Sequence, residues 1–317
     1  MLGGMFAVSA VRIDPKDPLS GLELGERPEP APRPGWTVVT VKAAALNHHD
    51  LWTLRGVGIT EDKLPMILGC DGAGVTEDGT EVLIHSVIDP RDGEPSILTE
   101  AYDGTFAERV LVPTANLVPK PAALSWEQAA CLPTAWLTAY RMLFRNSGLR
   151  PGDTVLVQGA GGGVATALIV LARAAGFRVW ATSRSEEKRA RALELGAHAV
   201  FESGARLPER VDAVMETVGA ATWAHSVKSL RPEGTIVISG ATSGAMPPAE
   251  LTRIFFLQLR VVGSTMGSLD ELKALVRMCE ATGVRPVVDS VSPLAQARAG
   301  FERMEEGEAF GKIVFTL

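Results

Sequence analysis

A glycine-rich turn between an apolar strand and a helix is the feature that most constrains this chain. The segment Gly159-Ala-Gly-Gly-Gly-Val-Ala165 directly follows the apolar stretch 154–158 and leads into the helical pattern of 164–175. Glycine permits a tight turn and lets backbone N–H groups approach a pyrophosphate, and the N-terminus of the following helix supplies partial positive charge. This context favours a dinucleotide site over a ligand-free turn. The residues expected to bind the nucleotide here are Gly159, Gly161, Gly162, Gly163 and Val164.

Strands and helices alternate through the second half of the chain. The expected strands are 154–158, 178–182, 211–216, 235–239 and 260–264, and the expected helices are 164–175 and 185–195. This βαβ alternation is typical of a doubly wound parallel sheet. The fold class is therefore predicted to be α/β, with a Rossmann domain in this half.

The first 120 residues have a different sequence pattern. Short strands at 38–41, 81–85 and 107–112 are separated by glycine and proline. Such a pattern of short strands and turn residues favours a partly open β-barrel over a parallel sheet.

The strand-and-turn pattern gives way to the alternation of strands and helices near residue 124, where Ser125-Trp-Glu-Gln128 has the form of a helix capping box. Strand-like segments return at 287–289 and 312–316, and these could rejoin the barrel. We therefore expect a discontinuous barrel domain at 1–123 and 267–317, and a Rossmann domain at 124–266.

The residues at the end of the second Rossmann strand indicate which nucleotide is bound. Folds that prefer NAD usually place Asp or Glu there, to accept a hydrogen bond from the ribose 2′-OH. Here the strand ends at Ser183, followed by Arg184 and, one helical turn later, Lys188. A hydroxyl and two cations suit a 2′-phosphate, so the sequence favours NADPH. The alternative is that both cations belong to a solvated helix start beside Glu186 and Glu187.

Composition and charge limit the kinds of binding partner that the chain is expected to have. The net charge of −6 argues against a nucleic-acid or anionic-membrane surface, because both need a basic patch. The longest apolar run, 166–175, is interrupted by Arg173 and is too short to span a bilayer. The three cysteines form no C-x-x-C pair, and no signal-peptide pattern is present at the start. We expect a soluble cytoplasmic protein with a small-molecule substrate.

Five further segments, taken with the glycine loop, resemble the medium-chain dehydrogenase/reductase superfamily in its zinc-independent, quinone-oxidoreductase-like branch. They are 45–50, 65–74, 132–140, 185–188 and 195–197, and they occur in the family's order. The resemblance implies a GroES-like β-barrel catalytic domain around a Rossmann domain, with the active site in the cleft between them. It also implies a homodimer, joined through the sheet edge near Arg260 to Met266.

The metal positions of the superfamily are changed in this sequence. Zinc alcohol dehydrogenases carry Cys where Asn47 stands, His-Glu where Cys70-Asp71 stands, and a third ligand near Thr134. An amide, a thiol and a hydroxyl are not a plausible tetrahedral zinc set, and the segment 88–104 lacks the four cysteines of the structural zinc lobe. We therefore predict no metal. An unusual site built from His48, His49, Cys70 and Asp71 is the alternative; adjacent histidines on an extended segment, which point in opposite directions, argue against it.

Without a metal, the accessible hydride acceptors are a quinone or a C=C bond conjugated to a carbonyl, which hydrogen bonds can polarise. Asn47 either donates to the substrate carbonyl, orients the nicotinamide neighbourhood or caps a local turn. By resemblance, Asp50 is a common acid of the family that organises its segment. Tyr140 and His49 are candidate proton donors, with solvent as the alternative, and Tyr140 could instead pack at the domain junction.

The resemblance also places residues around the nucleotide. Thr138 would approach the nicotinamide or its ribose, and Ser264 would lie near the carboxamide. Val218 and Gly240 follow strands and would line the nucleotide. Trp52 and Trp136 either line the substrate cleft or belong to the core. Cys70 is expected to be an inert packing residue.

These observations lead to a first hypothesis and three others. The first is an NADPH-dependent enone or quinone reductase. The second is a non-catalytic NADPH-binding or redox-sensing protein, which the glycine loop fits equally well. The third is an enoyl-thioester reductase with a basic entrance at Arg141, Arg145 and Arg150. The fourth is an alcohol dehydrogenase with an atypical metal.

Overall fold

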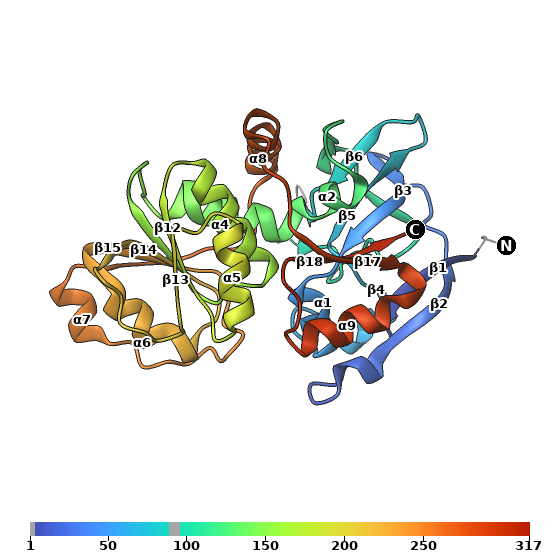
Figure 1. Ribbon diagram of the computed structural model, residues 1–317. Helices are drawn as coiled ribbons and strands as arrows, with labels where there is room; N and C mark the ends of the chain where they lie inside the picture. The colour runs from blue at the N-terminus through green and yellow to red at the C-terminus, as the bar shows by residue number, and fades with distance from the viewer. Residues whose placement is uncertain (1–3, 89–95) are drawn as a thin grey trace. The chain divides into compact units, whose positions relative to one another are not determined.

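The chain forms two compact units in a computed structural model that describes residues 4–88 and 96–317 (Figure 1). Unit 1 runs to Thr134 and also contains Ser268–Ala281 and Arg285–Leu317; unit 2 contains Ala135–Gly267 and Thr282–Val284. The first division thus lies later in the chain than the boundary expected after residue 123. Within the described residues, no helix has both the length and the apolar character needed to cross a membrane.

Unit 2 is built on a parallel sheet of six strands in the order β13-β12-β11-β14-β15-β16. The strands are β11 (Thr154–Val157), β12 (Arg178–Thr182), β13 (Ala199–Phe201), β14 (Val211–Glu216), β15 (Leu230–Ile238) and β16 (Arg260–Gly263). The helices are α3 (Leu137–Arg141), α4 (Gly163–Ala174), α5 (Glu186–Glu194), α6 (Ala220–Ser229) and α7 (Leu251–Phe256). Every residue of β11 is buried, as expected for a central strand covered on both faces. The predicted Rossmann fold is confirmed.

The strand order fixes where a ligand can bind. The chain leaves β11 towards β12 on one side and later returns to β14 on the other, so the order reverses beside β11. In open parallel sheets, ligands bind at the carboxyl ends of the strands next to this switch point. The glycine loop follows β11 at that place.

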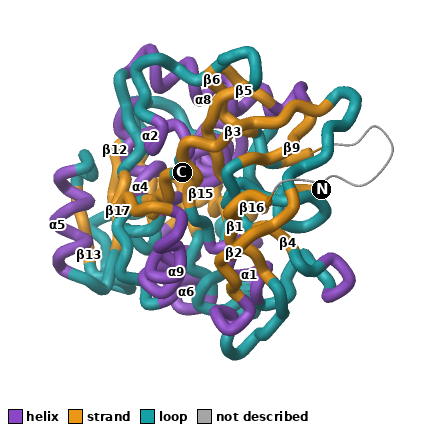
Figure 2. The backbone as a smooth tube through the Cα atoms, turned by 90° about the vertical axis from the view of Figure 1, so that its right-hand side faces the viewer, coloured by secondary structure: helices purple, strands orange, loops and turns teal. Residues whose placement is uncertain are grey.

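Unit 1 contains two main sheets, one antiparallel and one mixed, whose strands are drawn in orange in Figure 2. The smaller sheet comprises β1 (Gly4–Ala10), β2 (Leu22–Pro28) and β4 (Met66–Ile67). The larger comprises β3 (Trp36–Ala45), β5 (Asp71–Thr76), β6 (Glu81–Ile84), β9 (Arg109–Pro113), β10 (Leu117–Pro119), β17 (Val288–Pro293) and β18 (Lys312–Thr316). An isolated bridge joins Ala7 of the smaller sheet to Ala107, two residues before the start of β9 in the larger sheet. This arrangement agrees with the GroES-like barrel that was predicted.

Three helices of unit 1 contact other elements of the barrel domain: α1 (His48–Leu54), α2 (Trp126–Ala130) and α9 (Ala297–Glu305). A fourth helix, α8 (Leu269–Thr282), belongs to unit 1 except for its last residue. The core is aromatic where α9 meets the sheet: the ring of Phe106 packs edge-on against Phe301 and Phe315, with centroids 6.1 and 5.3 Å away. The predicted capping box of α2 is present, because Ser125 and Gln128 exchange hydrogen bonds.

The C-terminal strands rejoin the barrel, as predicted. Strand β18 pairs antiparallel with β3, with Val314 opposite Ala45, and β17 pairs with the other edge of β18. Gly311 has a φ of 110°, and a Cβ there would collide with the carbonyl oxygen of Val287. Glycine at this position therefore lets β18 enter in the register that carries Lys312 into the sheet.

One local prediction is wrong. His48 and His49 are not extended but begin α1, so their side chains are separated by about 100° around a helix instead of pointing in opposite directions. Cys70 is followed directly by β5, whose first residue, Asp71, pairs with Ala45. Both segments therefore adjoin the end of β3.

The segment 88–104, which replaces the zinc lobe, is only partly described. A two-stranded sheet is formed by β7 (Val87–Ile88), at the start of this segment, and β8 (Ser96–Ile97), near its middle. Residues 89–95 lie outside the described part of the chain. The buried Thr99 has a φ of 77°, which is unusual for a β-branched residue.

Candidate nucleotide and catalytic sites

The glycine loop in unit 2 has the conformation that its sequence predicts. Gly159 and Gly161 have φ values of 72° and 141°, which favour glycine. The loop ends at Gly162, the N-cap of α4, and Gly163 is the first residue of that helix. A Cβ at Gly159 would lie 2.6 Å from Val218 Cγ2, so the predicted residue Val218 lies directly against the loop. Backbone N–H groups and a helix N-terminus thus meet at the switch point, where they suit a pyrophosphate.

One basic side chain from α5 extends to this loop, and others lie around the turn that precedes the helix. A Cβ at Gly161 would lie 3.3 Å from Lys188 Nζ, so the ammonium lies over the loop. Arg184 is exposed, and Ser183 is buried with its hydroxyl accepting from the N–H of Ser185. Arg189 donates to the carbonyl oxygens of Ser183, at 2.7 Å, and Arg184, at 3.2 Å. Sequence reasoning missed Arg189, for which the only signal was one more basic residue at the start of a helix.

A buried polar network holds the ends of three strands together beneath the loop. Gln158, which follows β11, accepts a hydrogen bond from Thr182 of β12 at 2.6 Å and donates to Ser226 of α6 at 2.9 Å. Ser226 in turn donates to Glu216 at the end of β14. Glu216 also accepts from the N–H groups of Val218 and Gly219, so it fixes the turn that faces the glycine loop. Sequence reasoning missed this network because its members are far apart in the chain.

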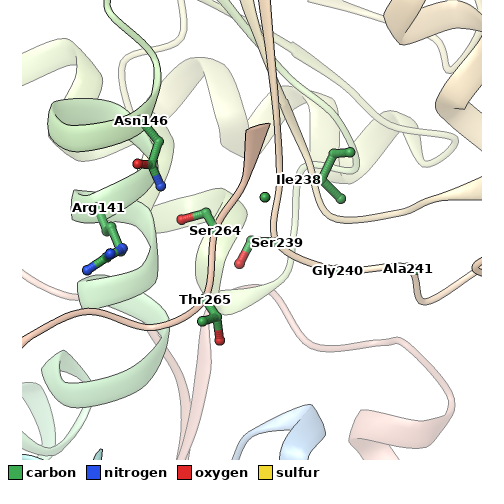
Figure 3. A pocket seen from close by; sticks show the side chains of 9 residues that line it. Arg141, Asn146, Ile238, Ser239, Gly240, Ala241, Ser264 and Thr265 are labelled. Atoms are coloured by element: carbon green, nitrogen blue, oxygen red, sulfur yellow. The ribbon is translucent and has the colours of Figure 1, made fainter. Parts of the chain in front are cut away.

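A cavity of about 600 Å³ opens at the carboxyl ends of β15 and β16 (Figure 3). Its lining residues are Arg141, Asn146, Ile238, Ser239, Gly240, Ala241, Gly263, Ser264 and Thr265. Two residues predicted from the resemblance, Gly240 and Ser264, are therefore brought together. The Ser264 hydroxyl oxygen is buried and has no hydrogen-bond partner among the described residues, so it can donate to a ligand that enters the cavity.

Two other predicted residues of unit 2 lie on α3. Thr138 is buried, and the ring of Tyr140 packs against Phe144 with centroids 4.7 Å apart. Neither is among the residues that line the cavity in the described structure. Trp136 is fully buried and is a core residue, whereas Trp52 in unit 1 is half-buried.

Unit 1 contains a buried network at the end of β3. The register of β18 against β3 sets Lys312 opposite Asn47, two residues beyond the Val314–Ala45 pair and therefore on the same face. Lys312 Nζ donates to Asn47 Oδ1 at 2.6 Å, to the carbonyl oxygen of Leu46 at 2.7 Å and to Asp71 Oδ2 at 3.0 Å. Sequence reasoning missed Lys312, since only the pairing of β18 with β3 brings it to residues that precede it by more than 240 positions.

The Asn47 side chain is fully engaged in this network. An ammonium only donates, so the atom facing Lys312 is the amide oxygen and the NH2 group points the other way. That NH2 group donates to Asp71 Oδ2 at 2.9 Å and to the Ala45 carbonyl at 3.1 Å, and lies 3.5 Å from Cys70 Sγ. The interpretation of Asn47 as a donor to the substrate carbonyl therefore needs correction, because both of its amide hydrogens are used within the protein.

Asp50 holds the backbone of this region. Its carboxylate accepts from the N–H of Asn47 at 2.8 Å and from the N–H of Gly69 at 2.9 Å. Burial raises the pKa of Asp50 to about 7, although these two N–H groups and the Lys312 charge act to lower it. The geometry supports an organising role for Asp50 by joining the start of α1 to the segment before β5.

The residues at the metal positions do not fit a zinc ion. Asn47 presents N–H groups, not lone pairs, to Cys70 and Asp71, and its only lone-pair atom, Oδ1, already accepts from Lys312. Burial raises the pKa of the Cys70 thiol well above its ordinary value, which disfavours the thiolate ligand. Across residues 4–88 and 96–317, no three His, Cys, Asp or Glu side chains are grouped so that they could hold a metal ion.

His49 and Glu100 form a second polar pair in unit 1. His49 Nε2 lies 3.8 Å from Glu100 Oε1, and it is buried without a hydrogen-bond partner among the described residues. Burial lowers the pKa of His49 to about 4, so the imidazole is neutral at pH 7. Glu100 follows the unusual backbone of Thr99, and a Cβ at Gly58 would collide with its carboxylate. Two uncommon backbone positions thus place this carboxylate beside the imidazole.

Comparisons with known proteins agree with both units. Residues 33–122 match the family described as the alcohol dehydrogenase GroES-like domain, and residues 163–281 match the family described as zinc-binding dehydrogenase. A zinc-type alcohol dehydrogenase-like protein of Schizosaccharomyces pombe is 31% identical, with 90% of this chain and 91% of that protein covered.

Two further relatives are similar over nearly their whole length. Acryloyl-coenzyme A reductase of Sulfurisphaera tokodaii is 29% identical, with 94% of this chain and 97% of that protein covered. The crystal structure of an NAD-dependent alcohol dehydrogenase superposes with a TM-score of 0.90 at 37% identity, covering 99% of this chain and 100% of the other.

Proposed function

Because this chain belongs to the medium-chain dehydrogenase/reductase superfamily, we propose that it is an NADPH-dependent reductase of a quinone or of a C=C bond conjugated to a carbonyl, and that it works without zinc. The observation that carries the proposal is the closed network of Asn47, Asp71 and Lys312, which occupies the hydrogen-bonding atoms of Asn47 at the first metal position. Without a Lewis acid to polarise an alcohol or an isolated carbonyl, the substrate must carry its own electron-withdrawing group.

The choice of NADPH depends on the end of β12. No carboxylate is present there to accept from a ribose 2′-OH, and Ser183, Arg184 and Lys188 offer a hydroxyl and two cations instead. Arg189 holds the backbone of this turn through Ser183 and Arg184. One structural relative is named as NAD-dependent, so a direct comparison of the two nucleotides is the test of this assignment.

An enoyl thioester is the second candidate substrate. The relative named acryloyl-coenzyme A reductase supports it, because an acryloyl thioester is a C=C bond conjugated to a carbonyl. Arg141 lines the cavity of unit 2 and could pair with an anionic group of such a substrate. A quinone or simple enone would not need that charge.

The residues of each unit have distinct tasks in this scheme. When bound, NADPH supplies the hydride. The glycine loop and Lys188 hold its phosphates, and Ser264 offers a hydroxyl in the neighbouring cavity. In unit 1, Asp50 and the Lys312 network keep the segment 45–50 rigid. The proton that completes reduction of a C=C bond comes from the His49 N–H or from solvent.

The proposal is tested by following NADPH oxidation with quinones, enones and enoyl thioesters, with NADH in parallel and a chelator present. Turnover that prefers NADPH and survives chelation is expected. Activity that chelation abolishes would refute zinc independence, and activity with NADH alone would refute the nucleotide assignment. Stoichiometric NADPH binding with no turnover across the panel would favour the alternative of a non-catalytic, redox-sensing protein.

A homodimer is part of the proposal. β16 is the edge strand of the parallel sheet, and exposed apolar side chains gather on it and on α7. They are Leu251, Phe255, Phe256 and Val261. Pairing of β16 with its symmetry copy would extend the sheet and remove an exposed edge from water.

A further inference from the structure

The ammonium of Lys312 is the only cation that forms an ion pair with Asp71 in the described structure. The Lys312 side chain is 3% exposed and that of Asp71 is fully buried. All three ammonium hydrogens have acceptors: a carbonyl oxygen, an amide oxygen and a carboxylate oxygen. A buried charge so completely paired is held in one position.

One of the three acceptors belongs to a residue at a metal position. Asn47 stands where zinc-containing members of the superfamily have a ligand, and Asp71 directly follows Cys70, which stands at another ligand position; Lys312 bonds to both Asn47 and Asp71. A divalent ion bound by Asn47 Oδ1 would have to displace the ammonium that lies 2.6 Å from this oxygen. The ammonium and a metal ion therefore compete for the only lone-pair atom of the Asn47 amide, and their charges repel each other.

We propose that Lys312 is the resident cation of this site and positions Asn47 and Asp71 in place of a divalent metal. The proposal rests on the proposed zinc-independent function and extends it by naming the group that replaces the metal. Lys312 is a positioning residue, because its contacts are with the protein and it reaches the reaction only through the segment 45–50.

The surroundings explain why a cation is needed here. Asp50 and Asp71 both bring buried carboxyl groups to this region, and Asp71 Oδ1 is buried with no hydrogen-bond partner among the described residues. Without Lys312, the Asp71 carboxylate would be buried without compensation, which is strongly unfavourable. The buried thiols of Cys70 and Cys131 add no positive charge, and His48 also experiences the Lys312 charge.

The test compares Lys312→Met, Asp71→Asn and the double variant with the full-length protein. Each single variant leaves one buried group without its partner, so we expect Tm to fall by about 10 °C. The double variant is neutral at both positions and should regain most of that loss. Lys273→Met is the control, because Lys273 on α8 pairs with the exposed Asp270.

Activity separates positioning from packing. In the double variant we expect kcat to stay lower by about 10–100-fold, as when groups that orient a site are removed, while KM for NADPH is unchanged. Recovery of kcat together with Tm would show that the pair is only structural and would overturn the positioning role. Lys312→Arg keeps the charge and should retain more activity than the methionine variant.

Cobalt(II) titration gives a readout that does not depend on turnover. The wild-type protein is expected to show no visible cobalt absorption and no thiolate-to-cobalt band. Stoichiometric cobalt binding that Asp71→Asn abolishes would overturn the proposal directly. If no acceptor is reduced by the wild-type protein, the proposed function fails, yet the Tm and cobalt results still decide the role of Lys312.

Discussion

The ammonium of Lys188 lies over Gly161, 3.3 Å from the point where a Cβ on that glycine would be. The two residues come from different βα units, since Gly161 follows β11 and Lys188 lies in the first turn of α5 after β12. Their proximity combines a phosphate-binding turn with a cation that reaches it from the neighbouring helix. Both the affinity for the nucleotide and the preference for its phosphorylated form should therefore depend on this pair.

Replacing Lys188 by methionine should weaken NADPH more than NADH. A hydrogen bond to a charged phosphate contributes about 1.5–3 kcal/mol, so the ratio of kcat/KM for NADPH over that for NADH should fall by roughly tenfold or more. Lys228→Met, in the last turn of α6, is the matched control and should leave the ratio unchanged. An equal loss for both nucleotides would assign Lys188 to the shared pyrophosphate instead of the 2′-phosphate.

Substituting Gly161 by valine should raise KM for NADPH by more than tenfold. The new side chain would meet Lys188 Cδ at 2.9 Å and would fill space above the loop, and its φ of 141° strains any L-residue. Gly204→Val is the control, because Gly204 also has a positive φ but nothing lies within 4 Å of its Cβ position. Tm should decrease by a similar amount in both variants. A normal KM in Gly161→Val would contradict the placement of the nucleotide at this loop.

Local sequence signals were sufficient for much of this architecture. Strands β12, β14 and β18 follow the bounds that their apolar patterns predict, and the glycine loop lies where strand, turn and helix succeed one another. These features depend on neighbouring residues, for which periodicity and turn chemistry are informative.

The parts that the sequence did not predict depend on contacts between distant segments. Lys312 reaches Asn47 only through the register of β18 on β3, and Glu216 reaches Gln158 only through Ser226 of α6. The error at His48-His49 has a similar origin, because Asp50 stabilises the start of α1 by accepting from the Asn47 N–H. Propensity alone did not indicate a helix of this length.

The pH dependence of stability should reveal two buried groups that act in opposite directions. The pKa of Asp50 is raised to about 7 from 3.8, so the folded protein binds this proton more tightly than the unfolded chain does. The contribution of Asp50 to the free energy of unfolding therefore decreases as pH rises from about 4 to 7. The pKa of His49 is lowered to about 4 from 6.5, so the unfolded chain binds more protons and stability rises over pH 4 to 6.5. Their effects partly cancel in the wild-type protein.

Single variants should separate these contributions. Asp50→Asn removes the Asp50 contribution, which decreases with rising pH. The free energy of unfolding, measured by denaturant titration, should therefore increase from pH 4 to 6.5 more steeply in this variant than in the wild type, by up to about 4 kcal/mol across the range. His49→Gln should do the reverse and make stability fall with rising pH. Parallel pH profiles for Asp50→Asn and the wild type would contradict the raised pKa of Asp50.

Replacing Phe256 by aspartate should dissociate the proposed homodimer. The Phe256 side chain is 75% exposed in the single chain and lies beside Phe255 on α7, so a buried charge at a symmetric interface would be placed against its own copy. Sedimentation equilibrium should give twice the chain mass of 33.6 kDa for the wild type and the single chain mass for the variant. Val57→Asp is the control, because Val57 is an exposed apolar residue of unit 1 and should leave the mass unchanged. A monomeric wild-type protein, or a variant that stays dimeric, would show that the apolar surface of α7 and β16 is not the interface.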